Sequence, residues 1–227
     1  MERLLRPKWL FACAFVIILI AVLINRRPAK IISINGKTMG TTYHVKYLDN
    51  GHGIKTLTIS NDLNKILKNI NQEMSTYIKD SNISLFNKST SLQWQSIPAD
   101  FFRVLEHALD VAKKTNGIFD PTIGPLVNIW GFGPDGNRQV PSTELIELTK
   151  KRVGYHYIEL KKSPFMIKKS NPSVYLDLSA SAKGFGVDTV SLHLRKLGLE
   201  NHMVEIGGEV RAAGTKNGEA WRIGIES

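Results

Sequence analysis

The chain has 227 residues, of which 42% are hydrophobic and 22% are charged, values that fit a globular domain and exclude an intrinsically disordered chain. The formal net charge is +10, but half of this excess lies in residues 1–30, and eight of the eighteen remaining lysines occur as four scattered pairs. Scattered pairs are typical of solvated helix ends and turns, so we expect no nucleic-acid partner.

Residues 1–30 contain an apolar segment that predicts an export signal or a membrane anchor. Sixteen apolar residues, from Trp9 to Ile24, lie between two basic flanks. At about 1.5 Å per residue this run spans roughly 24 Å, which suffices for a bilayer if the flanking Arg and Lys side chains snorkel. We expect a retained anchor in the inner membrane, with residues 31–227 forming a domain on its periplasmic side. A cleaved signal or lipidation at Cys13 is the weaker alternative.

The first part of the body predicts a hairpin followed by an amphipathic helix. Apolar and polar residues alternate around Asn35-Gly36, a dipeptide that favours a tight hairpin turn. Ser60 is the expected N-cap of the helix, whose apolar residues recur at helical spacing as far as Met74. Residues 75–89 are predicted to form a polar loop.

The segment after this loop predicts two further helices separated by an irregular stretch. One helix is expected from Pro98 to Asn116, with Gly117 as its stop. Another is expected from Ser142 to Val153, followed by strands at residues 155–160 and 173–179. Because helix and strand are mixed without a regular βαβ rhythm, the sequence predicts the α+β class.

The stretch between these helices, FDPTIGPLVNIWGFGP at residues 119–134, contains three prolines, three glycines and three aromatic residues. Proline removes backbone donors and glycine loosens the backbone, so neither a helix interior nor a central strand is expected. We interpret the stretch as a shaped loop. It either approaches a planar ligand closely or fills the core with its aromatic side chains.

Residues 174–198 predict a strand, a turn and a helix. The turn is made of small residues around Ser179–Ala182, which would leave the amides at the helix N-terminus free to bind an anion such as phosphate. Lys183 opposes the helix dipole unless an anion lies between it and the amides, although a plain surface lysine remains the alternative. Asp177, at the end of the strand, is either a helix-capping or salt-bridged carboxylate, or it binds a polar edge of a ligand or helps to place a metal.

The last part of the chain predicts two strands separated by turns. They are expected in residues 201–214 and 219–227, with Gly207-Gly208 marking a close approach of backbone to a ligand or a neighbouring element. The six histidines are dispersed and the chain has one cysteine, so a zinc site is not expected.

Five segments taken together carry a family resemblance. They are, in chain order, MGTTY, STY, FDPTIGPLVNIWGFGP, LDLSASAKGFGVD and VEIGGEVRAAG. In this order and spacing they resemble the ApbE family of FAD:protein FMN transferases, from about Gly36 to the last residue. The resemblance implies a mixed helix and sheet, T-fold-like domain. It also implies an enzyme that cleaves FAD with Mg²⁺ and joins FMN, through its phosphate, to a Thr or Ser of an acceptor protein, releasing AMP.

The same resemblance implies a set of site residues. The positions that match FAD contacts are Met39, Tyr77, Ile118, Phe119, Asp120, Asp177 and Lys183. Ala180 matches a magnesium position supplied through the main chain.

The family pattern normally continues beyond the position of Ser227, so the resemblance implies a domain whose C-terminal part is missing here. We therefore expect this chain to bind FAD poorly and to transfer little FMN compared with an extended form. A membrane-tethered flavin-binding protein, an inactive fragment and an FAD pyrophosphatase that uses water as the nucleophile remain as alternatives.

Overall fold

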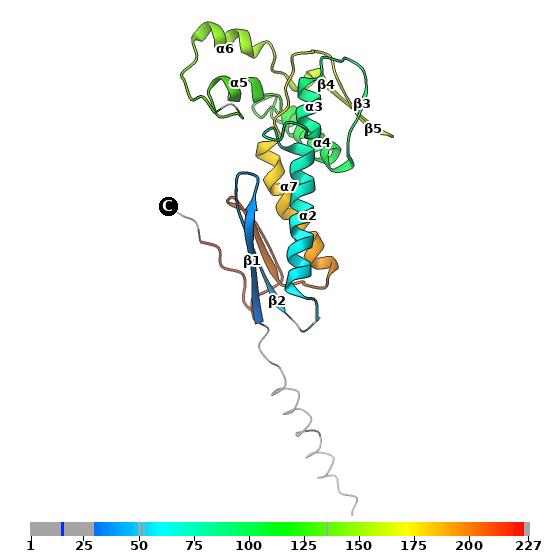
Figure 1. The fold of residues 1–227 in the computed structure, drawn as a ribbon, viewed down its shortest axis with the longest axis vertical. Coiled ribbons are helices and arrows are strands. Elements are labelled where there is room, and N and C mark those ends of the chain that lie inside the picture. Colours follow the sequence, from blue (N-terminus) through cyan, green and yellow to red (C-terminus); the bar gives the residue numbers. More distant parts are fainter. Residues whose placement is uncertain (1–14, 16–29, 50, 52, 135, 225–227) are drawn as a thin grey trace, which may run out of the picture.

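The computed structural model describes residue 15 and residues 30–224, apart from residues 50, 52 and 135 (Figure 1). Within this described part, the helices are all too short or too polar to cross a membrane. The anchor predicted in residues 1–30 lies outside the described residues, except for residues 15 and 30.

One half of the body is a four-stranded antiparallel sheet covered on one face by two long helices (Figure 1). The strand order is β1-β2-β6-β7, so the hairpin formed first in the chain pairs with a hairpin from much later. The bounds are β1 (Lys30–Thr38), β2 (Thr41–Asp49), β6 (His202–Ile206), β7 (Glu209–Ala213), α2 (Thr56–Met74) and α7 (Ser179–Lys196). Each long helix contacts the other and the sheet.

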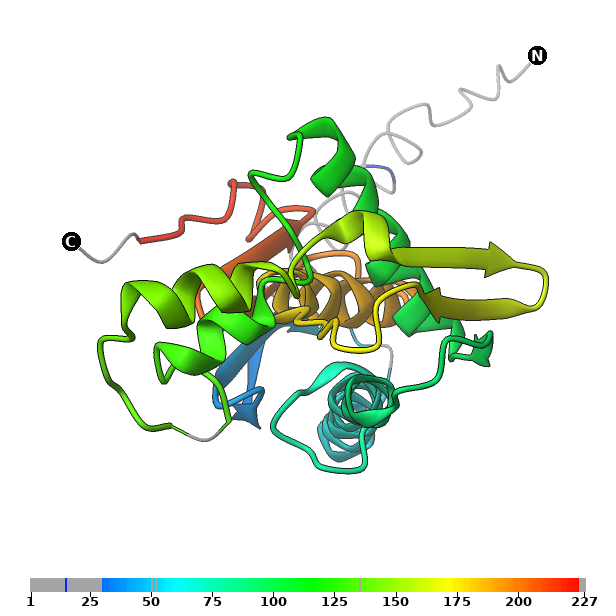
Figure 2. The ribbon, with the colours of Figure 1, turned by 90° about the horizontal axis from the view of Figure 1, so that it is seen from above.

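The other half contains the shorter helices and a small three-stranded sheet ordered β3-β5-β4. Seen from above, β4 and β5 project on the side opposite to α5 and α6 (Figure 2). The bounds are α3 (Asn82–Lys88), β3 (Gln95–Ser96), α4 (Ala99–Lys114), α5 (Gly124–Ile129), α6 (Thr143–Lys150), the 3₁₀ turn η1 (Tyr155–Tyr157), β4 (Ile158–Lys162) and β5 (Phe165–Lys169). The α+β class predicted from the sequence is confirmed.

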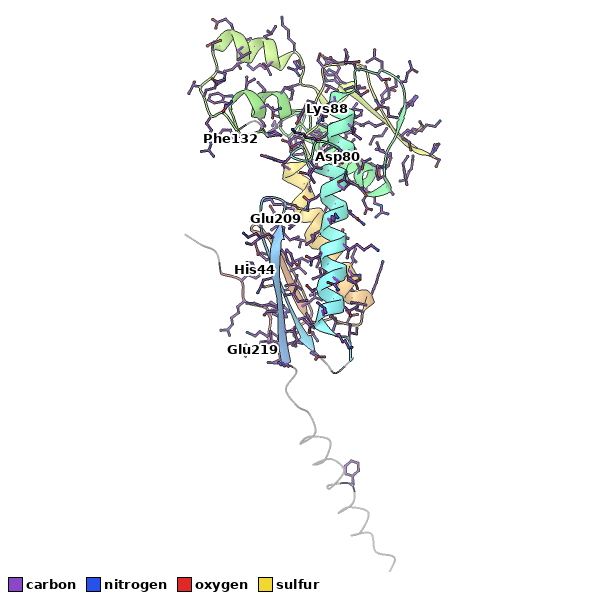
Figure 3. The ribbon with its side chains drawn as sticks, viewed as in Figure 1. His44, Asp80, Lys88, Phe132, Glu209 and Glu219 are labelled. Carbon is purple, nitrogen blue, oxygen red and sulfur yellow. The ribbon has the colours of Figure 1, made fainter. Side chains whose placement is uncertain are left out.

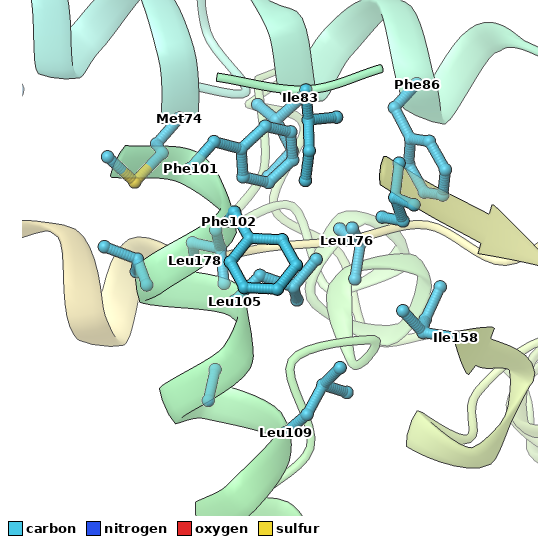
Figure 4. Packing of buried hydrophobic residues seen from close by; sticks show 14 of the residues in the cluster. Met74, Ile83, Phe86, Phe101, Phe102, Leu105, Leu109, Ile158, Leu176 and Leu178 are labelled. Carbon is cyan, nitrogen blue, oxygen red and sulfur yellow. The ribbon is translucent and has the colours of Figure 1, made fainter. Parts of the chain in front are cut away.

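Two hydrophobic cores correspond to these two halves. One lies between the four-stranded sheet and the long helices, with Tyr43, Leu63 and Val204 among its members. The other surrounds α4, and Figure 4 shows Phe101 of this core beside Ile83. Met39 packs against both cores, so the tip of the first hairpin lies where the two halves meet.

The first hairpin is present, but the prediction that it turns at Asn35-Gly36 is wrong. β1 continues through this dipeptide, and the two-residue turn is Met39-Gly40, flanked by the pair Thr38 and Thr41. Tertiary contacts override the local preference. Gly36 pairs with Tyr43, whose ring covers it so closely that a Cβ there would lie 2.5 Å from the ring.

Two helix predictions in residues 56–89 need correction. The helix expected to start at Ser60 starts at Thr56, one turn earlier, with Lys55 as an N-cap that makes no side-chain hydrogen bond. The loop predicted at residues 75–89 contains α3, which begins where the Ser81 hydroxyl accepts a hydrogen bond from the Ser84 amide. The sequence of this segment did not predict α3, because its residues are mostly polar and only one turn of the helix, around Ile83, is buried.

The strand predicted at residues 173–179 is extended but is not part of a sheet. Leu176 exchanges hydrogen bonds with the Asn87 side chain, through its amide at 2.8 Å and its carbonyl at 2.9 Å. The Asp177 amide donates to the Pro121 carbonyl at 2.8 Å. Alternate residues are buried as in a strand, but a side-chain amide and a loop carbonyl replace the neighbouring strand.

The remaining element predictions are mostly confirmed. The helices expected at Pro98–Asn116 and Ser142–Val153 are α4 and α6, and Ser142 caps α6 through its side chain. Residues 155–157 are a 3₁₀ turn before β4 rather than part of a strand. Residues 202–213 form the β6–β7 hairpin, whereas residues 219–224 show no strand in the described structure.

A buried histidine links α7 to β6 and predicts a pH dependence of stability. His202 lies with Nδ1 2.7 Å from the Leu199 carbonyl oxygen and Nε2 2.7 Å from the Ser191 hydroxyl. A neutral ring donates from Nδ1 and accepts at Nε2, so it satisfies both partners. Burial lowers the pKa of His202 below its ordinary value of 6.5.

We expect this histidine to destabilise the fold in mild acid. Below pH 6.5 the unfolded chain takes up a proton that the folded chain resists, so the free energy of unfolding falls by up to about 1.4 kcal/mol per pH unit until the folded-state pKa is reached. Urea unfolding of the wild type and of His202→Gln between pH 7.5 and 5 measures this. A pH slope that is the same for both proteins would contradict the expectation.

Candidate functional site

A cavity of about 850 Å³ lies between the tip of the first hairpin, α2, the segment that follows α2, and the start of α7. The hairpin contributes residues 37–40, α7 contributes Ser179, Ala182 and Lys183, and the segment after α2 contributes residues 75–78. The cavity therefore lies at the junction of the two halves, where surface pockets are commonly used for ligands.

The lining of the cavity combines apolar and positively charged side chains. Leu67, Ile70 and Met74 of α2 supply apolar surface. Lys37, Lys68 and Lys183 supply three cations, and among the described residues of the lining none is Asp or Glu. This combination suits a ligand that carries both an apolar ring system and an anionic group.

Lys183 lies in the second turn of α7, not in a turn before the helix. The residues predicted as a small-residue turn, from Ser179 onward, already form the first turn of α7. The Lys183 ammonium donates to the Gly207 carbonyl at 3.2 Å and lies 3.8 Å from the Glu209 carboxylate. Figure 3 shows Glu209 at the end of the four-stranded sheet that lies nearest the half with the shorter helices. The β6–β7 turn thus holds this lysine in the lining of the cavity.

Met39 and Tyr77 bring two other predicted positions to the same cavity. Met39 has a backbone φ of 50°, which is uncommon for a residue other than glycine. Tyr77 has a side chain that is 63% exposed, and its hydroxyl donates to the Phe132 carbonyl at 3.0 Å. This hydrogen bond joins the cavity wall to the proline- and glycine-rich segment 119–134.

That segment is not an irregular loop throughout, as was predicted, because it contains the helix α5. Pro125 lies at the start of α5, where its missing amide hydrogen leaves no helical hydrogen bond unmade. Gly124 allows α5 to pack on Tyr175, since a Cβ at this position would lie 2.4 Å from the Tyr175 ring. Phe119 packs against the core, as one of the two interpretations expects, whereas Phe132 is largely exposed. A close approach of this segment to a planar ligand stays a prediction.

Three predicted positions, Ile118, Phe119 and Asp120, do not line the cavity. The Ile118 side chain is 92% exposed. The Asp120 carboxylate accepts hydrogen bonds from the Thr122 amide and hydroxyl and from the Tyr155 amide, at 2.7 to 2.9 Å. These contacts give Asp120 a structural role in shaping the segment, and its predicted contact with FAD stays a prediction.

Asp177 and Ala180 lie at the start of α7, beside the cavity rather than in its lining. The Asp177 carboxylate accepts a hydrogen bond from the Ser179 amide at 2.8 Å, so it satisfies an amide of the first turn of α7, although the N-cap of this helix is Leu178. Ala180 is exposed in the first turn of α7. Among the described residues there is no cluster of three or more His, Cys, Asp or Glu side chains that could hold a metal ion.

Sequence reasoning missed the contribution of α2. Asn64, Lys68, Asn71 and Ser75 line the cavity and recur at intervals of three or four residues, which places them on one face of a helix. The periodicity of this helix identifies its buried apolar residues, and it does not show which polar residues line a cavity. A polar stripe of uncharged amides beside a lysine was the signal available in the sequence.

Comparison with known protein families shows to which family this chain belongs. The model of the ApbE family matches residues 39–227, which include the hairpin tip, the segment with α5 and the start of α7. The chain belongs to the ApbE family. Curated members similar to it are named FAD:protein FMN transferase. The protein from Haemophilus influenzae is 46% identical over 207 residues, and that from Vibrio cholerae is 38% identical over 220 residues.

The chain spans part of the length of these relatives. The match covers 88% of this chain and 60% of the H. influenzae protein, and 96% of this chain and 64% of the V. cholerae protein. The protein from Escherichia coli K12 is 31% identical over 198 residues, which are 85% of this chain and 56% of that protein.

Solved ApbE structures have the same fold. The flavin transferase ApbE from V. cholerae superposes with a TM-score of 0.84 at 39% identity, covering 88% of this chain and 64% of that one. The apo form of the flavinyl transferase ApbE from Pseudomonas stutzeri superposes with a TM-score of 0.82 at 32% identity, covering 88% and 67% of the two chains. The ApbE-like arrangement of helices and sheets expected from the resemblance is confirmed.

Proposed function

We propose that the protein is an FAD:protein FMN transferase. The proposal is supported by the names of the ApbE relatives and by one observation above all. The cavity at the junction of the two halves has apolar side chains, three lysines and, among its described lining residues, no carboxylate. FAD combines a large aromatic ring system with a pyrophosphate, and this lining suits both parts.

The reaction transfers a phosphoryl group from FAD to a protein hydroxyl. The bond between the FMN phosphorus and the bridging oxygen breaks, and a bond forms between that phosphorus and the oxygen of an acceptor Thr or Ser. AMP leaves with the bridging oxygen, and the hydroxyl proton is released. Phosphoryl transfer depends mainly on positioning and on neutralising charge.

Among the described residues, the lysines of the cavity are the ones that would neutralise the charge of the pyrophosphate. Lys37, Lys68 and Lys183 come from three different elements, and all three line the cavity that would hold the anion. The amides at the start of α7 add the positive end of a helix dipole beside Lys183. Together they hold the pyrophosphate and stabilise the charge that develops on the departing phosphate.

Magnesium is part of the proposal as a requirement to be tested. Mg²⁺ prefers octahedral oxygen coordination with one or two carboxylates as well as substrate phosphates. The described residues offer the Ala180 backbone carbonyl and no cluster of acidic side chains, so they do not form a magnesium site by themselves. We assign no step of the reaction to the metal.

We also propose that residues 1–30 anchor the protein in the inner membrane, with the ApbE domain on the periplasmic side and with an exported protein as the acceptor. The support is the apolar run from Trp9 to Ile24 between basic flanks. Fractionation of cells that express the intact protein tests the anchor. Recovery of the uncleaved protein in the soluble fraction would reject it.

The decisive experiment is an assay of covalent flavin transfer. The protein is incubated with FAD, Mg²⁺ and a threonine-containing acceptor protein, with the H. influenzae relative as a positive control and EDTA as a negative one. A transferase gives a fluorescent acceptor, heavier by FMN less one water, and an equal amount of AMP. Free FMN without labelled acceptor indicates a pyrophosphatase, and bound but unchanged FAD indicates a binding protein. The chain spans 60 to 64% of these relatives and is expected to transfer little FMN, so the same assay is run on a form extended by the relatives' C-terminal segment. Either result with both forms would reject the transferase.

A further inference from the structure

The turn of the first hairpin has an unfavourable backbone at a position that faces the cavity. Met39 and Gly40 both have positive φ, 50° and 73°, as in the tight turns that favour Asn-Gly. A methionine is less stable than a glycine in this conformation, because its side chain crowds the backbone. The chain nevertheless turns here and not at Asn35-Gly36, which lies within β1.

A hydrogen bond from α2 fixes the residue next to this turn. The Asn71 amide nitrogen donates to the Thr38 hydroxyl at 2.9 Å and to the Leu67 carbonyl of its own helix at 2.9 Å. Both hydrogens of this amide are therefore used, and the second bond fixes the side chain on the helix. Thr38 is buried, with 9% of its surface exposed, and its strand ends at the turn.

We propose that Asn71 and Thr38 are positioning residues that hold the Met39-Gly40 turn against the cavity so that Met39 meets the bound flavin nucleotide. This inference rests on the proposed function and adds to it a pair of residues to which the family resemblance gave no role. Asn71 and Thr38 line the cavity together with Met39. The Met39 methyl group also lies close to Gly186 of α7, so the turn is held between the two long helices.

The Asn71–Thr38 hydrogen bond differs from other contacts between the hairpin and α2 in its position next to the turn. A second contact joins the same hairpin to the same helix farther from the turn, where the Tyr47 and Thr56 hydroxyls lie 3.4 Å apart. Tyr47 belongs to the core, and neither residue lines the cavity. Loss of either bond loosens the hairpin on α2, but only loss of the Asn71–Thr38 bond releases the turn itself.

The test measures the affinity for FAD by titration of flavin fluorescence. Thr38→Val removes the acceptor with little change in shape, and we expect it to weaken FAD binding about fivefold to tenfold, the equivalent of about 1 to 1.4 kcal/mol. Thr38→Ser keeps the acceptor and should remain within about twofold of the wild type. Tyr47→Phe, the matched control, should lower thermal stability without weakening FAD binding, because neither Tyr47 nor Thr56 lines the cavity.

A double-mutant cycle decides whether the two residues act together. If Asn71 acts through Thr38, the variant Asn71→Ala combined with Thr38→Val binds FAD no more weakly than Asn71→Ala alone. Additive losses, or unchanged binding by Thr38→Val, would overturn the inference while leaving the proposed function intact. Absence of FAD binding by the wild type would instead reject the proposed function, and the inference with it.

Discussion

The Lys183→Met variant is expected to bind FAD about tenfold to a hundredfold more weakly than the wild type. Lys183 is the cavity lysine that lies closest in sequence to the start of α7, and its ammonium is held there by the Gly207 carbonyl. A hydrogen bond between a charged donor and a phosphate contributes roughly 1.5 to 3 kcal/mol, which corresponds to this range. Transfer of FMN at limiting FAD should fall by at least the same factor.

Two further variants show whether the effect is specific to this position. Lys196→Met makes the same change in charge at the other end of α7, on an exposed side chain, and should leave FAD affinity unchanged. Lys183→Arg keeps the charge and should retain part of the affinity. Titrations at low and high salt distinguish a local contact from general attraction, because exposed charges are screened at high salt. Equal affinities for Lys183→Met and the wild type would show that this lysine does not contact the ligand.

The Phe101→Ala variant is expected to lower the free energy of unfolding by about 3 to 5 kcal/mol. Phe101 is fully buried in the core around α4, beside Ile83 (Figure 4). Its removal leaves a cavity in this core that α3 and α4 cannot readily close, because both helices also pack on α2. Since domains of this size are stable by roughly 5 to 15 kcal/mol, the loss is a large share of the total.

Urea unfolding measured by circular dichroism tests this expectation. Leu85→Ala, on the exposed side of α3, removes a side chain that is 54% exposed and should change the free energy of unfolding by less than about 1 kcal/mol. A loss below 1 kcal/mol for Phe101→Ala would show that the core around α4 repacks freely.

The sequence predicted the elements whose local signals agree with their tertiary surroundings. α4 has a clear apolar stripe that is buried, and Ser142 caps α6 as its position suggests. The errors occur where a distant contact opposes a local preference. Asn35-Gly36 favours a turn, but the Tyr43 ring lies over Gly36 and keeps both residues in the strand. Residues 173–179 alternate like a strand, but Asn87 occupies the place of a neighbouring strand.

The sequence predicted only those site residues that belong to short recognisable motifs. Met39, Tyr77 and Lys183 come from three separate stretches, and the structure brings them to one cavity. Lys37 and Lys68 escaped notice because a lysine on a hairpin or a helix usually faces solvent, and nothing local distinguishes these two. Their role depends on how α2 crosses the hairpin tip, a long-range arrangement that periodicity does not encode.

The pairing of β2 with β6 has a consequence for how the protein is made. Tyr43 to Tyr47 of β2 pair with residues 202–206, so the inner edge of the first hairpin has no partner until the ribosome has completed β6. At about 5 to 20 residues per second, synthesis of the intervening chain takes on the order of 10 to 30 s. Throughout this interval the nascent chain presents an uncovered strand, which is a typical target for chaperones and a starting point for aggregation. Yield in cells should therefore depend on translation speed and on chaperone supply more strongly than the equilibrium stability of the finished domain would suggest.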